Sequence, residues 1–331
     1  PLPGGFGGVV EFGDACLALA TDGVGSKLQI ANQLGRNEGV GIDCVAMNVN
    51  DLICVGAEPL AFVDYVAVPE TDPDVHAVLG ASLSEGCSRA RVTLAGGETA
   101  TLPGIVYELD LSGTALGWFP RGGGITGEGL EAGDVLIGLP SSGLHSNGYT
   151  LVRAVLERSG CSLGDAAPFD VEHPSREVDR FPDSSGKASL GEVILNPTRI
   201  YVDPVVDLIM ESRGEGGVCP EGSIKAIAHI TGGGLSNLLR LHGSLGWHIG
   251  EPLSAQPEFE WIAEIGSVES KEMHRTFNMG MGMVVAVSAA VADPVADWLE
   301  ERLTGSRVVG EVIDQGRVVT HSDPGVRFVR Y

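Results

Sequence analysis

Apolar, strand-like runs in this chain repeatedly end in a glycine-rich stretch that carries acids or hydroxyls. The first such run, residues 15–20, leads into an acid, two glycines, a hydroxyl and a lysine: Asp22, Gly23, Gly25, Ser26 and Lys27. Glycines let a backbone approach a bulky ligand or adopt a positive φ. An acid beside free backbone N–H groups can hold a metal ion that bridges phosphates. Alone, the stretch is equally consistent with a tight turn, but its recurrence favours a functional site.

The same arrangement returns three times along the chain. After the predicted strand at 92–95 come Gly96, Gly97, Glu98 and Thr99. After the predicted strand at 135–139 come Ser141, Ser142, His145, Ser146 and Asn147. After the predicted strand at 224–230 come Thr231, Gly232, Gly233 and Gly234. The last two loops precede predicted helices, whose N-termini present free N–H groups, so both loops predict anion sites. An elaborate N-cap for the loop after 135–139, and an ordinary loop role for His145, remain the alternatives.

Residues 39–55 predict an amphipathic helix. At 100° per residue, its apolar arc contains Ile42, Val45, Val49, Leu52 and Ile53. The opposite arc contains Asp43, Met47, Asn48, Asn50 and Asp51. A solvated helix face usually carries Lys and Glu, which form helices better than Asn and Asp. We therefore interpret this polar arc as a ligand-facing surface, with a solvated face as the alternative.

The predicted elements divide the chain into two domains, which its length of 331 residues allows. Residues 1–121 predict an α+β domain of about four strands plus helices, including a helix at 73–89. Its strand at 60–68 is apolar on both sides, with Leu60 and Phe62 on the same side, so it is expected to be covered on both. Residues 133–331 alternate strands with helices, which indicates a layered α/β domain. The glycine-rich residues 122–127 form the predicted linker.

Charge and cysteine usage restrict the partners and the compartment. The net charge of −23 argues against binding to nucleic acid or to an anionic membrane. No apolar run approaches the roughly 20 residues that span a bilayer. The six cysteines form no C-x-x-C pair, so neither a zinc site nor a disulfide framework is indicated. A reduced, cytoplasmic location is the expectation.

Several of these stretches, taken together, resemble a known enzyme family. They are TDGVGSK (21–27), GIDCVAMNVNDL (41–52), AGGETA (95–100), GLPSSGLHSNGYTLVR (138–153), HITGGG (229–234) and MHRTFNMGMGM (273–283). In this order, and through nearly the whole chain, they are similar to the phosphoribosylformylglycinamidine cyclo-ligase family, also called aminoimidazole ribonucleotide synthetases. That family usually carries a further N-terminal segment that contributes to the nucleotide site.

The resemblance implies a reaction and its cofactors. ATP activates the amide oxygen of a formylglycinamidine ribonucleotide, an amine nitrogen closes the imidazole ring, and phosphate leaves. Mg²⁺ holds the ATP phosphates, and K⁺ is commonly needed. The resemblance also implies a homodimer in which each first domain supplies four strands to a shared β-barrel.

Roles for individual residues follow from the resemblance and the motifs together. The expected metal ligands are Asp22, Asp51 and Glu98. The expected nucleotide-binding residues are Asp22, Gly23, Gly25, Ser26, Lys27, Asn48, Asn50, Asp51, Gly96, Gly97, Glu98 and Thr99. Lys27 is expected to place its charge on a phosphate, and His145 to move a proton, so that Lys27, Asp51 and His145 are the catalytic candidates. The loops at 141–148 and 231–234 are expected to hold the phosphoribosyl substrate.

Related enzymes and a non-catalytic protein remain open alternatives. A thiamine-phosphate kinase would transfer phosphate without ring closure. A selenophosphate synthetase would need a reactive Cys near its N-terminus, and Cys16 lies instead inside an apolar strand. A nucleotide-binding subunit without catalysis would use the same phosphate loops.

Overall fold

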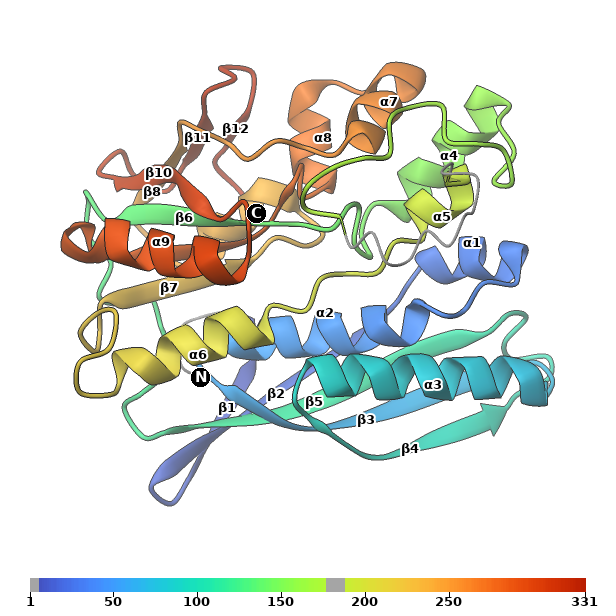
Figure 1. Cartoon of the computed structure of the whole chain (residues 1–331), viewed down its shortest axis with the longest axis horizontal. Helices are drawn as coiled ribbons and strands as arrows, with labels where there is room; N and C mark the ends of the chain where they lie inside the picture. Colours follow the sequence, from blue (N-terminus) through green and yellow to red (C-terminus); the bar gives the residue numbers. More distant parts are fainter. Residues whose placement is uncertain (1–5, 177–187) are drawn as a thin grey trace.

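Two β-sheets organise the protein. The computed structural model describes residues 6–176 and 188–331, with one sheet in each half of the chain (Figure 1). The strands of the first sheet are β1 (Gly8–Phe12), β2 (Ala15–Gly23), β3 (Glu58–Val68), β4 (Thr93–Thr101) and β5 (Asp110–Pro120). They lie in the order β1-β2-β5-β3-β4, with β3 and β4 parallel and the other neighbours antiparallel. The sequence pattern predicted about four of these strands and missed β1.

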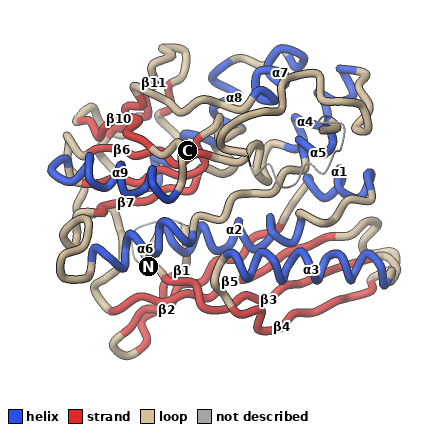
Figure 2. Tube along the Cα trace, viewed as in Figure 1, coloured by secondary structure: helices blue, strands red, loops and turns tan. Residues whose placement is uncertain are grey.

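Helices cover one face of this first sheet. They are α2 (Val40–Cys54) and α3 (Pro73–Arg89), which match the helices predicted at 39–55 and 73–89, while α1 (Lys27–Leu34) precedes them in the chain. The start of α3 is fixed by the Asp72 side chain, which accepts hydrogen bonds from the N–H groups of Asp74 and Val75. Figures 1 and 2 show α2 lying between the first sheet and the second half of the chain. This central place makes α2 a contact element for both halves.

The other face of the first sheet is apolar and uncovered in the single chain. The predicted strand at 60–68 is β3, but its alternation is broken, because the register between β3 and β5 shifts between Pro59 and Ala61. This β-bulge turns Leu60 outward, where it is 41% exposed, while Phe62 stays buried. The prediction that Leu60 and Phe62 share a side was therefore wrong. Val63 and Tyr65 are also outward and exposed.

The second half builds a seven-stranded sheet in the order β12-β11-β8-β10-β6-β9-β7. Its strands are β6 (Val135–Pro140), β7 (Ile224–His229), β8 (Gly246–Ile249), β9 (Met281–Val287), β10 (Arg307–Ile313), β11 (Val319–His321) and β12 (Arg327–Phe328). All neighbours are antiparallel except β8 and β11. Its helices are α4 (Tyr149–Ser159), α5 (Leu190–Ile194), α6 (Val202–Ser212), α7 (Pro257–Gly266), α8 (Ser270–Thr276) and α9 (Ala292–Arg302). The described residues of this half also form the 3₁₀ helices η2 (Gly234–Arg240) and η3 (Ala289–Val291).

A buried ion pair joins the two halves. Lys27 Nζ lies 2.8 Å from Asp43 Oδ2, and neither side chain is exposed to solvent. Lys27 also donates to the carbonyl oxygens of His145 and Asn196, at 3.1 and 2.9 Å. Asp43 Oδ1 accepts hydrogen bonds from both the N–H and the hydroxyl of Thr198, each at 2.7 Å. Lys27 and Asp43 both belong to the first half, and both are thus hydrogen-bonded directly to the second half.

Among residues 6–176 and 188–331, no helix has the length and apolar character that crossing a membrane requires.

The buried pair predicts a large stability effect for one substitution. Lys27→Met leaves Asp43 buried without its counter-charge, and breaking a buried pair in this way costs about 3–5 kcal/mol. Since each kcal/mol shifts the melting temperature by about 2–4 °C, the melting temperature of Lys27→Met should fall by at least about 6 °C. The matched control is Arg36→Met in the exposed pair with Glu38, where the expected loss is below about 1 kcal/mol. Equal melting temperatures for the two variants would contradict the role of the Lys27–Asp43 pair.

Candidate functional site

The polar arc of α2 continues into a second contact with the other half of the chain. Asp51 Oδ1 lies 2.9 Å from Nδ1 of His229, the last residue of β7. The Asn50 side chain donates to the carbonyl oxygen of Arg199 at 2.8 Å and accepts from the N–H of Tyr201 at 3.0 Å. Much of the arc that the sequence indicated as ligand-facing therefore forms the joint between the halves. His229 was not among the predicted site residues, and its signals are its position two residues before the glycine loop at 231–234 and its place in the HITGGG stretch.

Asp22 reaches the same arc from the end of β2. The Asn48 side chain donates to the backbone oxygens of Asp22 and Cys44, at 3.2 and 2.8 Å, and its own Oδ1 is buried without a hydrogen-bond partner. Burial raises the pKa of Asp22, and the nearby negative charge of Asp51 raises it further. Two neighbouring carboxylates and an unsatisfied amide oxygen are hard oxygen donors of the kind that Mg²⁺ prefers. The residues present therefore fit a magnesium ion.

Glu98 does not join these groups. Residues 96–99 lie inside β4 and not in a loop as predicted. Glu98 pairs with Tyr65 of β3, on the outward face, whereas its neighbour Gly97 pairs with Asp64. A Cβ on Gly97 would lie 2.4 Å from Asp64 Oδ1, so packing explains that glycine. Within the described ranges, no three His, Cys, Asp or Glu side chains are grouped to hold a metal, so the expected three-acid site does not form in one chain.

The turn from Asp22 to Lys27 leads into α1. The N–H of Gly23 donates to Asp22 Oδ1 at 2.8 Å, and Gly25 has a φ of 69°. A positive φ favours glycine, which explains structurally why residue 25 is a glycine. Ser26 stands at the N-cap without a side-chain capping bond. Lys27 is turned into the joint, so the structure places its charge on Asp43 and not at an exposed phosphate position.

The loop between β6 and α4 is held from inside by His145. Its Nε2 accepts a hydrogen bond from the N–H of Ser142 at 3.2 Å, and its φ of 59° is in the left-handed region. Burial holds the pKa of His145 well below its ordinary value, and the neighbouring His229, Lys27 and Arg199 lower it further. The ring is 1% exposed and its Nδ1 has no partner. In this geometry the neutral ring supports the loop, and it does not reach the surface where proton transfer was expected.

The two predicted phosphate loops meet each other. A Cβ on Gly232 would have Asn147 Oδ1 as its nearest neighbour, at 3.2 Å. The hydroxyl of Ser146 lies 3.0 Å from the hydroxyl of Thr198. Ser141 and Ser142 are buried beneath the loop, whereas Ser146, Asn147, Thr231 and Gly232 remain accessible. The accessible donors of both loops thus lie side by side, next to the strand that carries His229.

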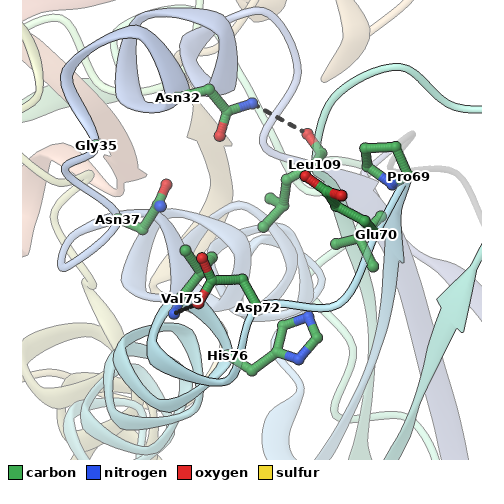
Figure 3. A pocket seen from close by; sticks show the side chains of 10 residues that line it. Asn32, Gly35, Asn37, Pro69, Glu70, Asp72, Val75, His76 and Leu109 are labelled. Carbon is green, nitrogen blue, oxygen red and sulfur yellow. Dashed lines mark hydrogen bonds between the residues drawn. The ribbon is translucent and has the colours of Figure 1, made fainter.

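A separate hollow lies near the beginning of α2, far along the helix from Asp51. It encloses about 540 Å³ of empty space open to solvent, and its wall includes Asn32, Asn37, Glu70 and His76 (Figure 3). Asn37 Oδ1 and His76 Nε2 are buried without partners. The hollow contains none of the predicted site residues, so it is distinct from the site around Asp22 and Asp51.

Comparison with known proteins agrees with this arrangement. Residues 4–119 match the model of the AIR synthase related protein N-terminal domain, and residues 131–323 match the C-terminal domain. A phosphoribosylformylglycinamidine cyclo-ligase of Methanococcoides burtonii is 42% identical over 313 residues, 95% of this chain and 84% of the relative. The chain belongs to the phosphoribosylformylglycinamidine cyclo-ligase family. A chloroplastic member from Arabidopsis thaliana is 43% identical over 95% of this chain and 75% of its own.

Solved structures share the fold at lower identity. A HypE–HypF complex matches with a TM-score of 0.62 and 19% identity, covering 96% of this chain and 89% of the other. A thiamine-monophosphate kinase from Stenotrophomonas maltophilia matches with a TM-score of 0.61 and 18% identity, covering 94% and 86%. These likenesses confirm the predicted two-domain fold and, at such identity, nothing finer.

The glycine loop at 231–234 offers a sharp test of substrate binding. Gly232 lies outside the left-handed region of φ and is bordered only by Asn147, so Gly232→Ala should change the free energy of unfolding by less than about 1 kcal/mol. The added methyl group should still obstruct close approach of a phosphate and raise the Kd of the family's phosphoribosyl substrate about tenfold, measured by calorimetry.

Gly234→Ala is the matched control. Its Cβ would lie 2.0 Å from the carbonyl oxygen of His274, and Gly234 has a φ of 53°, so this variant should lose about 2 kcal/mol or more of stability. If Gly232→Ala binds the substrate as tightly as the wild type, the loop is only a turn.

Proposed function

We propose that this chain catalyses the ATP-dependent ring closure of formylglycinamidine ribonucleotide to 5-aminoimidazole ribonucleotide, with release of ADP and phosphate, in purine biosynthesis. The observation that carries this proposal is the 42% identity to a named cyclo-ligase over 95% of the chain. The family-model matches over residues 4–119 and 131–323 include α2, both predicted phosphate loops and β7. All six cysteines are free thiols, which agrees with a reduced cytoplasmic location.

The site supplies a distinct group for each requirement of this reaction. Asp22 and Asp51, with Asn48 beside them, would hold Mg²⁺, which neutralises the ATP phosphates when it is bound. Glu98 of the same chain is left out of this assignment. The accessible donors Ser146, Asn147, Thr231 and Gly232 would hold the phosphate of the ribonucleotide, because hydroxyl, amide and backbone N–H groups bind anions.

The chemistry needs positioning more than a strong acid or base. The γ-phosphoryl group of ATP passes to the amide oxygen of the substrate, and ADP leaves. The amine nitrogen then attacks the activated carbon, the C–O bond breaks, the oxygen departs with phosphate, and the proton that the nitrogen loses passes to water. Since Lys27 already donates to Asp43, His145 and Asn196, the proposed site uses neither its charge nor the buried ring of His145 in direct contact with substrate.

The assay that tests the function offers ATP, Mg²⁺ and formylglycinamidine ribonucleotide to the chain. Aminoimidazole ribonucleotide and ADP should form in equal amounts. Asp22→Asn should lower kcat/KM at least about 100-fold, because it removes a metal-binding oxygen charge. The control Asp14→Asn changes an exposed turn acid and should match the wild type. ADP formation only with thiamine phosphate, or nucleotide binding without turnover, would favour the kinase or the non-catalytic alternative.

The uncovered face of the first sheet supports a homodimer. Side chains of β1, β2, β3 and β5 expose large apolar groups there: Val10, Phe12, Leu19, Leu60, Val63, Tyr65 and Trp118. The strand pairing places Val63 opposite Thr114, and Thr114 opposite Thr21, in one outward row across the sheet. Apolar patches of this extent usually mark protein–protein contacts. A second copy of the same sheet would cover the patch and close the barrel.

Assembly can be tested with one charge on this face. Val63→Lys should weaken dimerisation at least about tenfold, equivalent to about 1.4 kcal/mol, because the ammonium group would be desolvated in the contact. The control Val78→Lys changes a similarly exposed valine on α3. Sedimentation equilibrium should show dimers for the wild type and Val78→Lys. A monomeric wild type at micromolar concentration would contradict the dimer.

A further inference from the structure

His229 is held between two side chains of α2. Its Nδ1 lies 2.9 Å from Asp51 Oδ1, and its Nε2 lies 3.5 Å from Asn50 Nδ2. The His229 side chain is 1% exposed, while that of Asp51 is 21% exposed. In this contact, His229 is the buried partner from the second half, and Asp51 is the accessible partner at the candidate magnesium site.

The surrounding hydrogen bonds determine which ring nitrogen carries the proton. Asn50 Oδ1 accepts from the backbone N–H of Tyr201, which orients the amide. Asn50 Nδ2 is therefore the donor towards the Arg199 carbonyl and towards His229 Nε2. Because Nε2 faces a donor, it accepts, and the proton lies on Nδ1. His229 therefore donates from Nδ1 to Asp51 Oδ1.

We propose that His229 is a positioning residue for the Asp51 carboxylate. By holding Oδ1, it prevents the carboxylate from rotating and leaves the second oxygen for the magnesium ion that Asp22 shares. The inference rests on the proposed function. It also connects the two parts of that function, because Thr231 of the substrate loop follows His229 by two residues on the same segment.

Two amide variants distinguish this hydrogen-bonding role from a role in which the His229 ring only packs between the two halves. In His229→Asn, the side-chain nitrogen occupies the place of Nδ1, so the donor to Asp51 is kept and the contact with Asn50 is lost. In His229→Gln, the nitrogen reaches the place of Nε2, so the contact with Asn50 is kept and the donor to Asp51 is lost. Both variants remove the ring, and their ligand-free melting temperatures provide the control for a purely structural effect.

The measurement is calorimetric titration of the full chain with Mg²⁺ in the presence of a non-hydrolysable ATP analogue. His229→Gln should raise the Kd of Mg²⁺ about tenfold or more, since side chains that hydrogen-bond to a metal ligand commonly contribute about 10- to 100-fold to metal affinity. His229→Asn should stay within about threefold of the wild type. Wild-type affinity in His229→Gln, or equal losses in both variants, would overturn the proposal.

A second readout needs no ligand and no activity. In chain labelled with ¹⁵N-histidine, the His229 resonances, assigned by their absence in His229→Asn, should report the Nδ1–H tautomer. An Nε2–H tautomer would overturn the proposal even if the chain is an active cyclo-ligase. If no ring closure occurs while the Nδ1–H tautomer is seen and the two variants differ as expected, the proposed function fails and the role of His229 stands.

Discussion

The buried ion pair between Lys27 and Asp43 is the interaction on which the joint between the halves depends. Two opposite charges without solvent exposure are stable only when their remaining donors and acceptors are satisfied. Here the acceptors and donors come from His145, Asn196 and Thr198 in the second half. The halves must therefore dock in one arrangement, and this arrangement brings the predicted phosphate loops at 141–148 and 231–234 close to α2.

Along α2 the polar arc divides into two functions. The side chains of Asp43 and Asn50 form hydrogen bonds across the joint, whereas the Asp51 carboxylate stays accessible beside Asp22. The Asp51–His229 contact lies at the boundary between these functions. Since His229 ends β7 and the proposed substrate loop at 231–234 follows it, the proposed metal site and the proposed substrate loop are connected through a single strand.

The fold was largely predictable from sequence because its signals are local. The Asp72-Pro73 start of α3 and the apolar arc of α2 are set by capping and by helical periodicity. The bulge at Leu60 and the strand through Gly96 and Gly97 were not predictable, because they depend on pairing with distant strands. In the candidate site, composition indicated Asp22 and the loops at 141–148 and 231–234, and their binding roles stay predictions. The burial of Lys27 and the proposed role of His229 depend on contacts with the other half of the chain, which no local sequence pattern reveals.

The central claim is that Asp22 and Asp51 alone among the acids of the first half hold the magnesium–nucleotide complex, while Lys27 and Asp43 lock the joint. A crystal structure of the chain with Mg²⁺ and a non-hydrolysable ATP analogue tests this most directly. We expect a magnesium ion about 2.0–2.1 Å from an oxygen of each of Asp22 and Asp51. The Lys27–Asp43 pair should be intact in the same structure. A nucleotide whose phosphates contact Lys27, with the pair broken, or a magnesium ion bound away from Asp22 and Asp51, would contradict the account.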